Sequence, residues 1–132
     1  MKHFTIQELT RSATARQLGI DNTPPDSAVT ALHELVAAVL DPLREAWGGP
    51  IWVNSGYRCP ELNRVVGGAP NSQHQRGEAA DITVGSQDDN RRLLALIKQL
   101  DLPVDQCIDE KDCRWIHVSH RKCCNRRLYM KF

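Results

Sequence analysis

The sequence lacks long apolar runs and any strong excess of one charge. No segment approaches the roughly 18 apolar residues of a membrane-spanning helix, and the first residues, MKHFTIQELTRS, contain no apolar core of a secretory signal. The formal net charge is only +1, whereas nucleic-acid-binding domains carry a strongly basic face. We therefore expect a chain made in the cytoplasm that neither inserts into a membrane nor binds nucleic acid. The basic cluster from His120 to Lys131 is predicted to be a solvated tail.

Cysteine pairs with CxxC spacing are also missing. The five cysteines form an odd set that we predict to be free thiols in a reducing compartment. They are Cys59, Cys107, Cys113, Cys123 and Cys124. One competing metal set lies close together in the sequence: Cys113, His117, His120 and Cys123. Alternation along a strand disfavours this set, because it turns His120 away from the other two strand positions.

The chain has no internal repeat and no linker, which indicates one domain spanning residues 1–132. Apolar residues recur at three- and four-residue steps from Val29 to Trp47 and predict an amphipathic helix that Pro42 bends near its end. Further helices are predicted at 5–19, 60–66 and 87–100, and short strands at 51–58, 79–84, 105–109, 115–120 and 127–132. The pattern indicates an α+β domain in which helices pack on a small, mainly antiparallel sheet.

Two histidines and an aspartate form a candidate zinc site. Catalytic zinc usually takes three protein ligands and leaves one position for water. His74, Asp81 and His117 are suitable ligand types, and Gly77 allows a sharp turn between the first two. Asp81 lies on a predicted strand among alanines, where a carboxylate is costly unless it is paired or bound to metal. From the residues alone, ordinary histidines and a buried ion pair remain alternatives.

The segments SGYRCPELNRVVGGAPNSQHQRGEAADI and WIHVS resemble the M15 family of zinc peptidases, which includes D-alanyl-D-alanine carboxypeptidases and phage endolysins. The family pattern S-G-[YF]-R, N, V-G-G, S-x-H-x-x-G-x-A-x-D and W-x-H is matched throughout. FTIQELTRSATARQLGIDNTPP extends the resemblance to the small single-domain subgroup, so it covers almost the whole chain. The resemblance implies a hedgehog/D,D-peptidase-like fold and one zinc ion per chain, bound by His74, Asp81 and His117.

The resemblance also implies roles for residues around the metal. Arg58 would hold the substrate and the oxyanion, as a fixed guanidinium that keeps its proton can do. Ser72 and Trp115 would line the substrate site.

One position departs from the family pattern. Many members carry an acid three residues before the last histidine, where this chain has Arg114. The small-domain subgroup instead tends to show D-Q-x-I-x-E, which DQCIDE at residues 105–110 fits. Glu110 is therefore the predicted general base, and Asp112 is the second candidate.

The resemblance implies a peptidase that hydrolyses the peptidoglycan stem peptide, as a D,D-carboxypeptidase or an L-Ala-D-Glu endopeptidase. A phage or prophage endolysin would fit, acting on the cell wall once lysis releases it, and we expect a monomer. Because position 114 lacks the acid, a second interpretation stays open. The chain could be a catalytically inactive, zinc-stabilised module for cell-wall binding or signalling.

Overall fold

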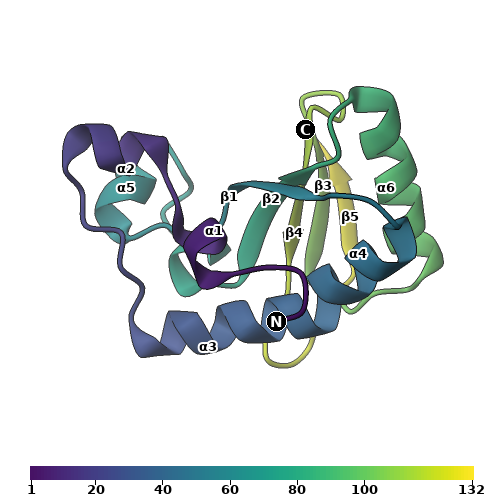
Figure 1. The fold of residues 1–132 in the computed structure, drawn as a ribbon, viewed down its shortest axis with the longest axis horizontal. Helices are drawn as coiled ribbons and strands as arrows, with labels where there is room; N and C mark the ends of the chain where they lie inside the picture. The colour runs from purple at the N-terminus through teal and green to yellow at the C-terminus, as the bar shows by residue number, and fades with distance from the viewer.

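A computed structural model describes residues 1–132, which form helices packed on a five-stranded sheet (Figure 1). The strands are β1 (Trp52–Ser55), β2 (Ala79–Thr83), β3 (Gln106–Glu110), β4 (Trp115–Ser119) and β5 (Leu128–Lys131). Their order in the sheet is β1-β2-β4-β3-β5. All neighbours are antiparallel except β5, which runs parallel to β3. The predicted α+β fold with a mainly antiparallel sheet is confirmed.

The helices before β2 differ in part from the prediction. They are α1 (Ile6–Thr10), α2 (Ala13–Leu18), α3 (Asp26–Leu35), η1 (Val36–Leu40), α4 (Asp41–Trp47), α5 (Pro60–Val65) and the short 3-10 helix η2 (Gln73–Arg76). The single helix predicted from Thr5 to Gly19 is wrong. Arg11 is extended, and the Ser12 side chain accepts a hydrogen bond from Ala15 N, so a second helix begins there.

The long helix around Pro42 changes its hydrogen-bond pattern one turn before the proline. η1 is a π-helical segment, and Asp41 N donates to Val36 O five residues earlier. Proline lacks an N–H and its ring crowds the carbonyl one turn earlier, which gives a physical reason for the wider turn. Leu32, Leu35, Val36, Val39, Leu40 and Leu43 on this helical run are all fully buried.

The two faces of the sheet have different roles. In the pairing of β2 with β4, Ala80 lies opposite Val118 and Asp81 lies opposite His117. Alternation along each strand directs Ala80 and Val118 to the core, where residues of α3, α4 and α6 (Gln87–Gln99) meet them. Asp81 and His117 therefore point to the opposite face. No helix in the structure has both the length and the apolar character that a membrane crossing requires.

Candidate metal centre and cleft

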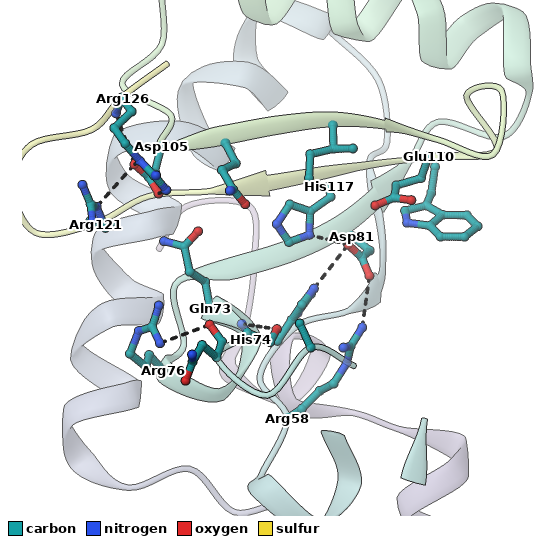
Figure 2. A pocket seen from close by; sticks show the side chains of 16 residues that line it. Arg58, Gln73, His74, Arg76, Asp81, Asp105, Glu110, His117, Arg121 and Arg126 are labelled. Atoms are coloured by element: carbon teal, nitrogen blue, oxygen red, sulfur yellow. Dashed lines mark hydrogen bonds and ion pairs between the residues drawn. The ribbon is translucent and has the colours of Figure 1, made fainter. Parts of the chain in front are cut away.

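Three residues from separate elements meet on the open face of the sheet (Figure 2). His74 comes from η2, Asp81 from β2 and His117 from β4, and their candidate ligand atoms all lie within 4.8 Å of one another. His74 Nε2 lies 3.3 Å from Asp81 Oδ1, and His117 Nδ1 lies 3.0 Å from the same oxygen. The structure thus brings together the three side chains that the sequence predicted as zinc ligands.

Local structure fixes His74 on a tight turn. The Ser72 side chain accepts a hydrogen bond from His74 N and begins η2. Gly77 ends it with a positive φ of 73°, and a Cβ at this position would collide with the carbonyl oxygen of Ala28. Glycine is therefore required at position 77 for two reasons, the positive φ angle of the turn and the close approach of α3.

The hydrogen bonds around the histidines test whether a metal ion fits. His74 Nδ1 lies 2.7 Å from Gly56 O and donates to it, so in the neutral ring Nε2 is the unprotonated nitrogen. The lone pair of Nε2 then faces Asp81 Oδ1. Because both atoms are hydrogen-bond acceptors, their close contact is favourable only with a cation between them. Separations of 3.0 and 3.3 Å are close to the roughly 3.4 Å edge of a tetrahedron with zinc–ligand bonds of about 2.0–2.1 Å. The site fits zinc.

The aspartate is held as a carboxylate. Burial raises the pKa of Asp81, but the interactions of its carboxyl group with the imidazoles of His117 and His74 lower the pKa by more, so the net pKa lies well below the ordinary value. A charged carboxylate that is only 8% exposed would be costly without such partners. Asp81 is therefore ionised, as a metal ligand must be.

Arg58 is fixed beside the second oxygen of Asp81. Its Nη2 lies 3.4 Å from Asp81 Oδ2, Nε donates to Ser55 Oγ, and Nη1 donates to Asn63 Oδ1. Gly68 leaves room for this arrangement, because a Cβ there would collide with Asn63 Oδ1 and lie 2.9 Å from Arg58 Nη1. The guanidinium lines the same cleft as the histidines. It can orient Asp81 and still face a substrate.

Glu110 also lines the cleft, at the end of β3 opposite Trp115 on β4. β3 and β4 form an antiparallel hairpin, and its turn has positive φ angles of 51°, 58° and 58° at residues 111–113. Burial raises the pKa of Glu110, and the negative charge of Asp81 raises it further. Asp112 lies in this turn, where its exposed carboxylate pairs with Arg91 at 3.1 Å. The structure brings Glu110 to the candidate metal centre and leaves Asp112 outside the cleft.

The remaining predicted residues also have clear positions. Ser72 and Trp115 both line the cleft. The competing Cys/His set does not assemble: His120 Nδ1 contacts Pro103 O instead, and Cys123 is exposed. All five cysteines are free thiols, as predicted.

The basic segment from His120 to Lys131 is not simply a solvated tail, which corrects the prediction. Its last residues form β5, and Arg121 and Arg126 line the cleft. Both guanidiniums reach Asp105, whose side chain is fully buried. No local pattern in the sequence signals this cluster, because the Asp105–Arg126 contact joins residues 21 positions apart.

Comparisons with known proteins identify the family of this chain. The structure combines an α+β fold with a His-Asp-His cluster and an arginine that line the same cleft. The chain belongs to the peptidase M15 family, whose model matches residues 2–119. The chain is also similar to the zinc D-Ala-D-Ala carboxypeptidase of Streptomyces albus G, with 45% identity over 64 residues. That alignment covers 46% of this chain and 25% of the relative, so this chain spans about a quarter of the relative's length.

Proposed function

We propose that the protein is a zinc-dependent peptidase that hydrolyses the stem peptide of peptidoglycan. The observation that carries this proposal is the cluster of His74, Asp81 and His117 in the lining of the cleft. Membership in the M15 family and the name of the similar carboxypeptidase support the reaction and the substrate class. We further propose that the chain acts as a monomer on cell wall made accessible by lysis.

The residues of the cleft have distinct roles in this proposal. His74 Nε2, His117 Nδ1 and Asp81 Oδ1 would hold one zinc ion, which when bound lowers the pKa of water and polarises a carbonyl group. Glu110 accepts a proton from the attacking water and returns it to the leaving amine. Burial and the charge of Asp81 raise the pKa of Glu110, which is the direction that helps this carboxyl group return the proton as an acid.

Arg58 supplies positive charge where the oxyanion forms. The guanidinium is held by Ser55, Asn63 and Asp81, so it is already oriented before substrate binds. A donor fixed in this way stabilises developing negative charge without reorganisation during the reaction. Arg58 therefore has two functions in the proposal, orienting the ligand carboxylate and contacting the substrate.

The alternative is an inactive module that keeps zinc for stability. Its main support was the absence of an acid at position 114. Arg114 is exposed and does not line the cleft, whereas Glu110 does. The cleft thus contains a carboxylate despite the substitution, which favours the enzyme over the binding module.

Digestion of purified peptidoglycan tests the proposal and separates its two forms. The zinc-loaded protein is incubated with peptidoglycan, and the new ends are identified by mass spectrometry. Released D-alanine would assign a D,D-carboxypeptidase, and new N-terminal D-glutamyl ends would assign an L-Ala-D-Glu endopeptidase. Binding to peptidoglycan without any new end would overturn the enzyme in favour of the module.

Arg58→Lys is expected to retain fold and zinc but to lower kcat/KM by about 10²-fold. Lysine keeps the charge but lacks the planar fork that bonds Ser55, Asn63 and Asp81 at once. Steady-state kinetics, zinc content and thermal unfolding measure the three properties. Arg64→Lys is the matched control, since Arg64 is an exposed arginine on α5 that does not line the cleft. Equal activity of the two variants would show that Arg58 takes no part in the reaction.

A further inference from the structure

One end of the cleft has an arginine pair that the proposed mechanism does not use. Figure 2 shows Arg121 and Arg126 around Asp105, on the far side of His117 from Glu110. Asp105 precedes β3, and its side chain is fully buried. Arg126 donates to it from Nε and Nη2, both at 2.9 Å, while Arg121 Nε lies 3.3 Å from Oδ1. The buried carboxylate holds both guanidiniums at the wall of the cleft.

The cluster has an excess of positive charge and of hydrogen-bond donors. Two guanidiniums share one carboxylate, which leaves one positive charge uncompensated. Arg121 Nη2 donates to the backbone oxygen of Cys124 at 2.7 Å and leaves Nη1 without a bond, and Arg126 bonds Asp105 without using its own Nη1. Arg76 also lines the cleft but already pairs with Glu78 at 3.0 Å. An arginine pair of this kind matches the planar geometry of a carboxylate.

The register of the sheet places this pair away from the metal centre. Ile108 on β3 lies opposite His117, and Asp105 lies three residues before Ile108. At roughly 3.3 Å per residue, the separation along the strand is about 10 Å. An extended peptide in the cleft spans the same distance in about three residues. A carboxylate at the pair would therefore belong to a residue distant from the bond being cleaved.

We infer that Arg121 and Arg126, held by Asp105, form a carboxylate-binding subsite that selects acidic peptides with a free carboxylate about three residues from the scissile bond. The inference rests on the proposed peptidase function, because it takes the candidate metal centre as the point of cleavage. Arg121 and Arg126 also lie after residue 119, where the match to the family model ends. Asp105, which holds them, lies inside the match.

Two tripeptides that differ in one group test the subsite by binding alone. The C-terminal amide of L-Ala-γ-D-Glu-L-Lys carries its only carboxylate on the glutamyl residue, and the C-terminal amide of L-Ala-D-isoglutaminyl-L-Lys carries a carboxamide in its place. Titration calorimetry on the zinc-loaded protein should show about tenfold tighter binding of the carboxylate peptide, the effect of a charge-assisted bond that is partly exposed to solvent. Arg121→Gln should bring the ratio of the two affinities close to one. Arg127→Gln, an exposed neighbour that pairs with Asp101 outside the cleft, should keep it.

The outcomes distinguish the subsite from a structural clamp and from the proposed function. If Arg121→Gln weakens both peptides equally and preserves the ratio, the arginine only anchors its segment and the inference is overturned. Equal binding of the two peptides to the unmodified protein, or no binding of either, also overturns it. Discrimination between the peptides in a protein that hydrolyses no stem peptide would support the subsite and reject the peptidase.

Discussion

Glu110→Gln is expected to reduce hydrolysis of stem peptide by at least about 10³-fold while zinc content and thermal stability stay unchanged. Glutamine keeps the shape of the side chain and removes its ability to accept a proton. Glu110 does not belong to the cluster of candidate ligands, so the metal should remain bound. The expected loss falls on kcat, because proton transfer belongs to the chemical step rather than to substrate binding.

Asp112→Asn is the matched control for this variant. Asp112 is two residues away in the sequence, but its exposed carboxylate pairs with Arg91 and does not line the cleft. An exposed pair of this kind contributes little to stability. We expect near-normal turnover of Asp112→Asn, measured beside Glu110→Gln on the same stem peptide. An inactive Asp112→Asn with an active Glu110→Gln would reverse the assignment of the base, and two active variants would place the base elsewhere.

Replacement of any predicted ligand by alanine should remove both zinc and activity. His74→Ala, Asp81→Ala and His117→Ala each leave two ligands where three are needed. We expect zinc affinity to fall by more than about 10²-fold. Removing a residue that only hydrogen-bonds a metal ligand already lowers metal affinity by about 10–100-fold. Zinc content by mass spectrometry after dialysis, together with turnover, measures the effect.

A cysteine variant checks that the zinc belongs to this cluster. Cys123→Ser removes a member of the competing set and lies at an exposed position. Its zinc content should match that of the unmodified protein. If Cys123→Ser loses zinc and His74→Ala retains it, the metal binds in the segment after β4. That result would refute the ligand assignment.

Much of the candidate site could be predicted because its residues lie in short motifs on regular elements. Strand alternation places Asp81 on the face opposite Ala80, and the pairing of β2 with β4 then sets it beside His117. The strands predicted at 105–109 and 115–120 are separated by a segment short enough for a turn, and they pair as the hairpin that carries Glu110. In each case the local pattern and the tertiary structure agree.

The features that the sequence did not predict depend on contacts between distant segments. Nothing near Arg126 indicates that Asp105 will bind it, because that contact needs β5 to lie parallel to β3. A role for Arg58 followed from the family resemblance alone, because its contact with Asp81 joins residues 23 positions apart. The break between α1 and α2 arises from Ser12. Its side chain accepts a hydrogen bond from Ala15 N and so begins a new helix where the first could otherwise have continued.

Stepwise addition of zinc to metal-free protein tests the central claim most directly, that a single zinc ion at His74, Asp81 and His117 serves peptide hydrolysis. The rate of stem-peptide hydrolysis is followed as zinc is added. We expect no turnover before addition, a linear rise that ends at about one equivalent per chain, and a flat trace for His117→Ala. Full turnover of the metal-free protein, or restored turnover of His117→Ala at one equivalent, would contradict the account.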